Sequence, residues 1–442
     1  MEHTLEPLVY IGPAEGNPKA EWKLKSPREI LALKICDMAM GSGAFLVQCC
    51  RYLAERLVEA WQILEDETNP ASKNPTSEIR NPKFIITPEG DLSAGSSAER
   101  LLPADPAERL AIARRYVADR CLYGVDINPM AVEMAKLSLW LITLQQDRPF
   151  TFLDHALKCG DSLLGISNFE QLSRFSLDSS KEHQVLVLQG YEHHIKAATK
   201  LRQHIESLPS DTNDQIEHKN RFNLEAESHL SRLKLAASVL VSAKMQNLKG
   251  EVGEMARVKA HLAAYQAVEY GQLSDAHVIA AVNLANRRPF HWPLEFPEVF
   301  NDEENEVRTS GFDAFVGNPP FMGGQKITGG LGTDYRDYLV ENIARGQRGS
   351  ADYCSYFFLR SHALLNPNHG MAGLIATNTI AQGDSREVGM DQIITRGSII
   401  PRAISSRPWP GVAALEVAHV WLRRGKWEGD RILDDKVVSG IT

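Results

Sequence analysis

The first third of the chain alternates between two hydrophobic patterns. Short, nearly continuous apolar runs are typical of strands covered on both faces, whereas apolar residues three to four positions apart are typical of helices. The predicted elements, in order, are a strand at 30–36, a helix at 44–61, a strand at 121–126, a helix at 129–144 and a short strand at 157–161. This order predicts a parallel α/β sheet with right-handed crossovers.

The middle of the chain carries no strand pattern. From about 180 to 287 the sequence is dominated by Leu, Ala, Lys and Glu at helical spacing, which predicts a helical insertion. The stretch at 66–106 is rich in Pro, Ser, Asn and Asp and predicts a surface excursion. The alternation then returns, with predicted elements at 312–317 (strand), 352–365 (helix), 373–377 (strand), 398–404 (strand) and 417–422 (strand).

Composition and charge narrow the possible function classes. The 442 residues are 43% hydrophobic and 24% charged, which is typical of a globular protein with a sizeable core. The net charge of −8 argues against a surface coated with nucleic-acid contacts, but it allows a local basic cleft or a separate recognition domain. No apolar run is long enough for a membrane span and the start lacks a secretory signal, so a cytoplasmic protein is expected. The six cysteines show no metal-ligand spacing, so they are expected to be buried thiols, and no metal site is predicted.

A glycine turn follows the first strand. Asp37-Met38-Ala39-Met40-Gly41-Ser42-Gly43 leads directly into the first long helix. Glycines let the backbone bend tightly and let a ligand approach closely, and the helix N-terminus offers free N–H groups to a carboxylate. No Gly-Lys-Ser/Thr follows, so the turn is not a phosphate-binding P-loop. Taken alone, the turn is equally consistent with an ordinary loop.

Acidic residues stand at the ends of the next two strands. Asp126 ends the second strand, where a carboxylate can accept both ribose hydroxyls of a nucleoside cofactor. Asp161, followed by Ser162, ends the third strand, where a carboxylate can accept a hydrogen bond from an adenine amino group. The alternatives are a cap of the following helix for Asp126 and an ordinary turn for Asp161.

The motif Asn318-Pro319-Pro320-Phe321 directly follows a strand and decides the interpretation. The amide oxygen and a backbone carbonyl can both accept hydrogen bonds from one planar amino group, and consecutive prolines fix these acceptors in place. Holding both protons pulls the nitrogen toward tetrahedral geometry and exposes its lone pair for attack on a sulfonium methyl. Phe321 offers a surface on which a flipped base can stack.

Together these motifs resemble the N6-adenine class of DNA amino-methyltransferases, in the arrangement with the cofactor motif first. The matching segments are 37–45, 123–129 and 318–321, and the segment Phe290–Phe300 is similar to type IIG restriction–modification methylases and to BREX- or DISARM-like phage-defence methylases. The resemblance implies an α/β fold, a Rossmann-like S-adenosylmethionine-dependent methyltransferase sheet of seven strands with the last one antiparallel. A helical insertion would split it between strands three and four.

The same resemblance implies an organisation and a reaction. Its domains would be the cofactor-binding half (1–165), the mainly helical insertion (166–287) and the half with the catalytic motif and target-base pocket (288–442). The reaction would be site-specific methyl transfer from S-adenosylmethionine to adenine N6, within a restriction–modification or phage-defence system. The partner would be double-stranded DNA with a flipped adenine.

The site residues that the resemblance implies form three groups. The cofactor would be bound by Asp37, Ala39, Gly41 and Gly43 (methionine part), Asp126 (ribose), Ile127 (packing on the adenine), and Asp161 with Ser162 (adenine amino group). The target N6 would be held by Asn318 and the Pro319 carbonyl, with Pro320 fixing the turn and Phe321 stacking on the ring. Trp409 falls where this class places a second aromatic residue against the base, or else it is a core tryptophan. Gly323-Gly324 and Gly329-Gly330 flank a predicted loop that either closes over the base or is merely flexible.

The chain departs from this class in three places. Met38 stands where proline is usual, which predicts a looser cofactor loop. The Tyr-Thr-Pro signature that normally precedes the loop is not found, and the chain ends shortly after the last expected strand. A piece of a longer protein is therefore expected, with a target-recognition domain or subunit outside this chain. The alternatives are an inactive truncated methylase that acts as a binding or assembly component, and a protein glutamine N5-methyltransferase.

Overall fold

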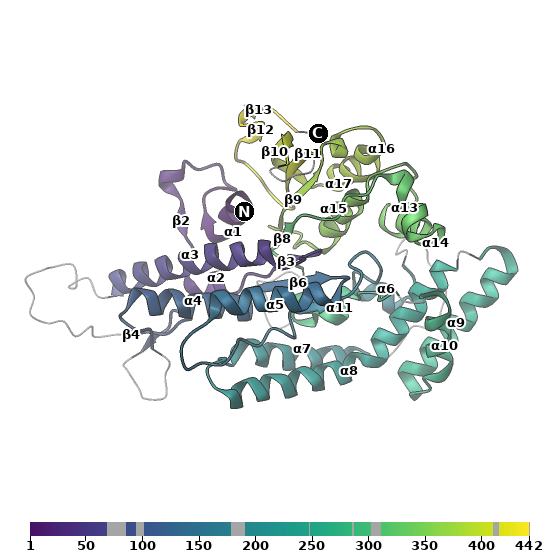
Figure 1. Cartoon of the computed structure of the whole chain (residues 1–442), viewed down its shortest axis with the longest axis horizontal. Helices are drawn as coiled ribbons and strands as arrows, with labels where there is room; N and C mark the ends of the chain where they lie inside the picture. Colours follow the sequence, from purple (N-terminus) through teal and green to yellow (C-terminus); the bar gives the residue numbers. More distant parts are fainter. Residues whose placement is uncertain are drawn as a thin grey trace, which may run out of the picture.

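A nine-stranded sheet runs through the middle of the molecule (Figure 1). The computed structural model describes residues 1–68, 85–93, 101–177, 191–246, 248–284, 287–301, 311–409 and 415–441. The sheet has the order β13-β12-β10-β11-β9-β8-β3-β6-β7. Its strands, in chain order, are β3 Ile35–Asp37, β6 Leu122–Asp126, β7 Leu157–Cys159, β8 Ala314–Gly317, β9 Met371–Thr377, β10 Ile399–Pro408, β11 Glu416–Arg423, β12 Arg431–Leu433 and β13 Lys436–Val438.

The seven expected strands are all present. The five strands from β9 to β7 are parallel, and β11, the last of the seven along the chain, is antiparallel to both β9 and β10. The sheet is wider than predicted, because β12 and β13 extend it beyond β10. Asp434 and Asp435 connect these two strands with φ values of 50° and 62°, as a two-residue hairpin turn requires. The pattern missed both strands because they are short and carry few buried side chains.

The hydrophobic pattern predicted a single strand at 30–36, and this prediction was wrong. Pro27–Leu31 form helix α2, and β3 begins only at Ile35. The Ser26 hydroxyl accepts a hydrogen bond from the Glu29 N–H, and the Glu29 side chain accepts one from the Ser26 N–H. This capping box, with a proline in the first turn, starts a helix within the apolar run.

Helices cover both faces of the sheet (Figure 1). Alternate strand residues point to opposite faces, so Ile35 joins one hydrophobic core and Cys36 the other. The first core is enclosed by α1 Glu2–Val9, α2, α3 Ala44–Thr68, α4 Pro106–Arg120 and α5 Pro129–Thr143. The second is enclosed chiefly by α7 Glu192–Ser207, α8 Asn213–Met245, α11 Trp292–Glu295, α12 Pro297–Phe300 and α15 Tyr353–Leu364.

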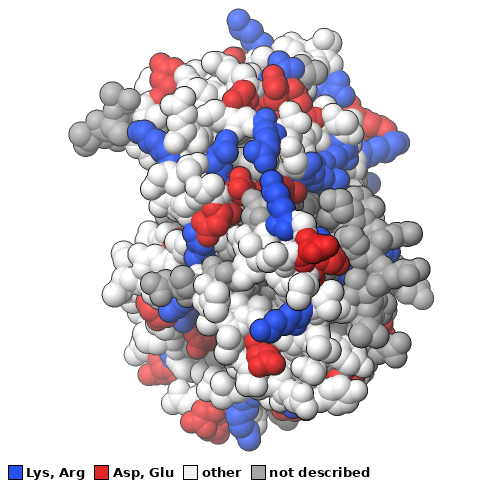
Figure 2. Space-filling view, turned by 90° about the vertical axis from the view of Figure 1, so that its right-hand side faces the viewer, with Lys and Arg blue, Asp and Glu red and all other residues white. Residues whose placement is uncertain are grey.

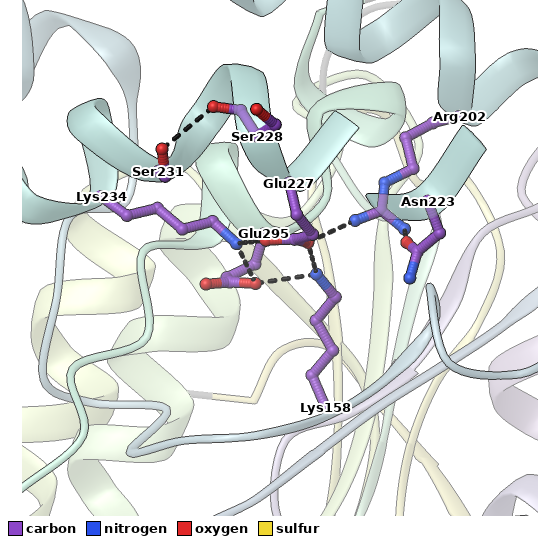
Figure 3. A network of polar contacts seen from close by, with 8 residues as sticks. All are labelled: Lys158, Arg202, Asn223, Glu227, Ser228, Ser231, Lys234 and Glu295. Carbon is purple, nitrogen blue, oxygen red and sulfur yellow. Dashed lines mark hydrogen bonds and ion pairs between the residues drawn. The ribbon is translucent and has the colours of Figure 1, made fainter. Parts of the chain in front are cut away.

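The predicted helical insertion lies between β7 and β8, and it is part of the main core. Leu230 and Leu233 of α8 are buried in the same cluster as Tyr123 of β6. A charged network fastens α8 to the sheet (Figure 3): Lys158 Nζ of β7 lies 2.8 Å from Glu227 Oε1 of α8 and from Glu295 Oε2 of α11. Burial opposes ionisation of Glu295, but Lys158 and the neighbouring lysine of α8 outweigh it and lower its pKa.

Smaller elements surround this framework. They are η1 Lys19–Glu21, α6 Phe169–Ser173, α9 Gly250–Tyr270, α10 Ser274–Leu284, α13 Gly324–Leu331, α14 Thr333–Tyr338, η3 Leu339–Ile343, η4 Asn378–Ala381, α16 Gly383–Ser385, η5 Arg386–Met390, α17 Asp391–Thr395, and the hairpins β1 Tyr10–Ile11 with β2 Lys23–Leu24 and β4 Ile85–Ile86 with β5 Leu92–Ser93. The glycine-flanked segment 323–330, predicted as a loop, forms α13, because Ile327 packs into the core and the helix can tolerate its glycines there. Much of the excursion at 66–106 lies outside the described residues.

Candidate active site

Four strand ends bring the predicted site residues to one edge of the sheet. Asp37 ends β3, Asp126 ends β6, Asp161 follows β7, and Asn318 follows β8. These strands are neighbours in the order β8-β3-β6-β7 and run parallel, so their carboxyl ends meet at the same edge. In open α/β sheets this edge is where ligands bind.

The glycine turn between β3 and α3 is held firmly and leaves space on its outer side. Gly41 has a φ of +54°, and a Cβ on it would meet nothing within 4 Å, so a ligand can approach its backbone. Gly43 has a φ of +80°, and its Cβ would lie 3.1 Å from Ala135 of α5. Gly41 therefore faces open space, whereas Gly43 permits the close approach of two helices. Ala39, which lies between the end of β3 and Gly41, is partly buried.

Met38 anchors the turn instead of loosening it, contrary to the sequence prediction. Its side chain is 4% exposed and fills the core beneath the sheet edge. Its carbonyl accepts a 2.5 Å hydrogen bond from the hydroxyl of Ser162, which is itself buried. A packed apolar side chain therefore restrains the backbone here without the ring of a proline.

Asp37 presents a buried carboxylate with one oxygen left over. Oδ1 accepts a hydrogen bond from the Ala39 N–H at 3.0 Å, whereas Oδ2 is buried and has no partner among the described residues. Burial raises the pKa of Asp37 to about 7; the Ala39 hydrogen bond lowers it and the charge of Asp126 raises it further. A Cβ on Gly317 would lie 2.6 Å from Asp37 Oδ1, so this carboxylate lies directly against the residue before Asn318.

Asn318 supplies a second buried acceptor. Its Oδ1 has no hydrogen-bond partner among the described residues. Pro319 is buried and Pro320 exposed, and Phe321 packs partly against the core. An amide oxygen that is buried without a donor is costly unless a ligand supplies one.

The segment after this motif is clamped by the start of α15. The Met322 carbonyl accepts a 2.8 Å hydrogen bond from the Tyr353 N–H. The Asp352 carboxylate accepts from the Met322 N–H at 3.3 Å and caps α15 by accepting from the Cys354 N–H at 3.1 Å. Asp352 is the first residue of the helix predicted at 352–365, and an aspartate at a helix start is the sequence signal that could have identified it as an N-cap.

Asp126 ties the glycine turn to the second strand. Its Oδ2 accepts from the Gly41 N–H at 2.9 Å and its Oδ1 from the Asn128 N–H at 2.8 Å. The next residue, Ile127, is 64% exposed, an uncommon setting for a large apolar side chain at a strand end. The predicted ribose contact of Asp126 and adenine contact of Ile127 stay predictions.

Asp161 lies deeper than predicted. It is 5% exposed, and the Tyr335 hydroxyl donates to its carboxylate at 2.8 and 2.9 Å. The Leu163 N–H donates to Oδ1 at 3.0 Å, and the Tyr353 hydroxyl lies 3.0 Å from that of Tyr335. Burial raises the pKa of Asp161 and the Tyr335 hydrogen bond lowers it in part. Neither tyrosine was predicted from the sequence, because a helical pattern does not show which side chains of a helix reach the residue after a distant strand, here Asp161 after β7.

Trp409 stands at the same edge as the other site residues. It directly follows β10, whose direction matches that of the parallel strands, and its N–H donates to the Leu415 carbonyl at 2.7 Å. The strand β10 is separated from β8 by β11 and β9. Residues 410–414 lie outside the described part, so stacking of Trp409 on a base stays a prediction.

The residues present fit a nucleoside-type cofactor with a charged amino acid tail. Asp37 Oδ2, which has no partner within the described ranges, is an acceptor suited to an ammonium group, the backbone at Gly41 is open, and Ile127 offers an exposed apolar surface. Among the described residues, no group of three or more His, Cys, Asp or Glu side chains is placed to hold a metal ion. All six cysteines are free thiols; five are buried, and Cys159 is half-buried.

The fold and this edge define a Rossmann-like methyltransferase domain of the S-adenosylmethionine-dependent class. Residues 120–396 match the family described as Eco57I restriction-modification methylase. This match spans more than half of the chain, so the chain belongs to that family. S-adenosylmethionine is the cofactor that the family implies. Within the described residues, no helix combines the length and apolar character that a membrane crossing requires.

The chain is similar to part of a longer protein. It is 26% identical over 281 residues to a Methanocaldococcus jannaschii protein named "Putative type II restriction enzyme and methyltransferase RM.MjaORFECS2P"; the match covers 59% of this chain and 22% of that protein. The chain therefore spans about a fifth of this relative.

The chain also has a distant similarity to solved structures. The type IIL restriction-modification enzyme MmeI, solved with DNA, has a TM-score of 0.40 at 12% identity, over 93% of this chain and 34% of MmeI. A type I restriction-modification methyltransferase subunit of Streptococcus thermophilus has a TM-score of 0.21 at 10% identity, over 92% of this chain and 84% of that one.

Proposed function

We propose that this chain transfers a methyl group from S-adenosylmethionine to the exocyclic N6 of adenine in duplex DNA. The observation that carries the proposal is the buried Oδ1 of Asn318 after the end of β8, which has no hydrogen-bond partner among the described residues and is followed by two prolines. Such an acceptor calls for a donor from outside the protein, and an exocyclic amino group is a donor of the right kind. The match to a family of restriction-modification methylases supports DNA as the substrate.

Each residue of the edge has a part in this reaction. Asn318 Oδ1 and the Pro319 carbonyl would accept the two amino protons of the target base and expose the nitrogen lone pair. A pre-organised, buried acceptor pair stabilises developing positive charge better than water does, because it need not reorient. Bound S-adenosylmethionine would supply the electrophilic methyl group. Phe321 would stack on the flipped base, whose extrusion from the duplex costs a few kcal/mol.

The cofactor would lie along the neighbouring strand ends. Asp37 would hold the ammonium group through its free oxygen, while Ala39, Gly41 and Gly43 shape the turn around the methionine part. Asp126 would accept the ribose hydroxyls. We further propose that Ile127 packs on the cofactor's adenine and that Asp161 and Ser162 hold its amino end, with Trp409 as a second aromatic surface for the target base.

The proposal extends to the organisation of the whole protein. Residues 1–165 would bind the cofactor, 166–287 form the mainly helical insertion, and 288–442 carry the catalytic motif and target-base pocket. A target-recognition domain or subunit outside this chain would choose the DNA sequence, and restriction–modification or phage defence would be the setting. A domain outside this chain is consistent with the match to the Methanocaldococcus jannaschii protein, which covers only 22% of that protein.

The test is transfer of a tritiated methyl group to mixed-sequence duplex DNA, with Asn318→Ala beside it. We expect N6-methyladenine from the unchanged chain and a loss of at least about 100-fold in Asn318→Ala, because one oriented acceptor of the transition state is removed. Calorimetric binding of S-adenosylmethionine should persist in that variant. Asn220→Ala, on the exposed surface of α8, is the matched control.

The outcomes separate the candidate functions. N4-methylcytosine as the product would overturn the choice of base while keeping the enzyme. Cofactor binding without transfer to any DNA would favour an inactive binding component. Transfer to a protein glutamine side chain and not to DNA would overturn the substrate.

A further inference from the structure

Two arginines project from the loop between η3 and α15. Arg345 and Arg348 are exposed, and neither has a hydrogen-bond or ion-pair partner in the part of the chain that the structure describes. Two other arginines of this part of the molecule are paired, Arg287 with Asp334 and Arg386 with Asp391. Figure 2 shows Lys and Arg side chains, with Asp and Glu among them, on the upper half of the face that holds α13 to α17, and further charged side chains of both signs on the lower half.

The loop is held in one conformation by its backbone. Arg345 has a φ of +50°, which is uncommon for a residue other than glycine. The Gly346 N–H donates to the Val340 carbonyl at 2.8 Å, and the Ser350 N–H donates to Asp384 Oδ2 at 2.5 Å. The left-handed conformation of Arg345 ends η3 and, with these hydrogen bonds, fixes the path of the loop that carries both arginines.

The far end of the loop lies against the catalytic segment. A Cβ on Gly324 would lie 2.3 Å from the Ser350 carbonyl oxygen, so the two backbones are in direct contact. Three residues further on, the Tyr353 N–H binds the Met322 carbonyl, and Met322 is only four residues after Asn318. The loop therefore borders the place where the target base is expected.

The loop creates a local positive field. Burial and the charge of Arg345 together lower the pKa of Arg396 to about 10. Burial, followed by the charges of Arg424, Arg396 and Arg345, lowers the pKa of His362 to about 4. Cations held close together in this way are stabilised when an anion binds beside them.

We propose that Arg345 and Arg348 form a phosphate clamp that grips the backbone of duplex DNA beside the flipped adenine. A guanidinium group binds a phosphate through two parallel hydrogen bonds, so a pair of them can hold successive phosphates in register. This clamp lies on the catalytic domain itself and is distinct from any sequence-reading domain. The inference rests on the proposed function and names the part of the DNA that the loop holds.

The test is the salt dependence of duplex DNA binding, measured by fluorescence anisotropy for the full chain. We expect the Arg345→Gln/Arg348→Gln variant to have a slope of log K against log salt that is shallower by roughly 2, since each lost phosphate contact removes about 0.9. The loss should be similar for DNAs of different sequence. Arg345→Lys/Arg348→Lys, which keeps both charges, should retain the slope of the unchanged chain.

The matched control removes two charges elsewhere. Arg221→Gln/Lys436→Gln changes exposed residues on α8 and β13 and should leave the slope unchanged. Identical slopes in the loop variant and the unchanged chain, with methyl transfer intact, would overturn the clamp and leave the proposed function standing. If the unchanged chain binds no duplex DNA at low salt, the clamp is overturned as well, and methyl transfer then decides the function separately. If the Arg345→Gln/Arg348→Gln variant shows the same decrease in salt slope with single-stranded RNA, the assignment to duplex DNA is overturned.

Discussion

Two buried oxygen atoms lie at the carboxyl ends of the adjacent strands β3 and β8. Asp37 Oδ2 and Asn318 Oδ1 both lack a donor among the described residues, and a Cβ on Gly317 would lie 2.6 Å from Asp37 Oδ1. A protein interior rarely leaves such acceptors empty, since each costs free energy when it is removed from water. At the scale of single residues, the site is thus a pair of acceptors prepared for two different donors.

The pKa of Asp37 leads to a prediction about pH. A carboxylate with a pKa of about 7 is mostly protonated at pH 6 and mostly ionised at pH 8. Since the proposed ammonium contact needs the ionised form, affinity for S-adenosylmethionine should rise about tenfold between these pH values, as calorimetry would measure. Asp37→Asn should bind weakly, with affinity nearly independent of pH.

The same pKa has the opposite effect on the cofactor-free chain. An acid whose pKa is higher in the folded than in the unfolded state favours folding in its protonated form. The contribution of Asp37 to stability is therefore present below its ordinary pKa of 3.8 and is lost as the pH rises to about 7. Thermal unfolding of Asp37→Asn should lack this part of the pH dependence; an unchanged profile would contradict the raised pKa.

At the scale of elements, the site depends on how strands and helices are fastened together. The loop after β8 is clamped by the N-terminus of α15, and the turn after β3 by Asp126 of β6. On the far side of β7, Lys158, Glu227, Lys234 and Glu295 join the sheet to α8 and α11 (Figure 3). In this network only Glu227 and Lys234, both in α8, are close to each other along the chain.

The charged network predicts a large effect of a small substitution. Glu295→Gln should lower the free energy of unfolding by roughly 3 kcal/mol, because it leaves Lys158 and Lys234 to share the one carboxylate of Glu227. Chemical denaturation followed by circular dichroism measures this. Glu133→Gln, which disrupts a surface pair with Lys136, should change it by less than about 0.5 kcal/mol. Similar effects of the two substitutions would contradict the role of the network.

At the scale of the whole molecule, the helical insertion is a structural part of the methyltransferase domain. The second hydrophobic core contains residues of α7 and α8 together with β6, β8 and the segment 290–300. The catalytic edge lies between this lower layer and the upper group of helices α13 to α17 (Figure 1).

This arrangement predicts that the insertion cannot be removed. Replacing residues 191–284 by a short Gly/Ser linker should abolish cooperative thermal unfolding, because one face of the sheet would lose its apolar cover. The physical reason is burial and not catalysis, so a cofactor analogue should not rescue the fold. A cooperative transition in the shortened chain would show that the insertion is an appendage.

The sequence by itself determined the alternation of strands and helices, the place of the insertion, and the local motifs at Asp37, Asp126, Asp161 and Asn318. These follow from hydrophobic period, glycine and proline, which act over a few residues. It misjudged the run at 30–36, where a capping box starts a helix, and the segment 323–330, where core packing produces one.

Only the tertiary structure decided which residues meet. The contacts of Asp161 with Tyr335, of Met322 with Tyr353 and of Asp37 with Gly317 join residues far apart in sequence. The same is true of Arg345 and Arg348, which have no ion-pair partner in the part of the chain that the structure describes, since only the folded chain shows which cations find a carboxylate. Pairing, burial and unsatisfied acceptors are properties of neighbours in space, and hydrophobic period along the chain carries no information about them.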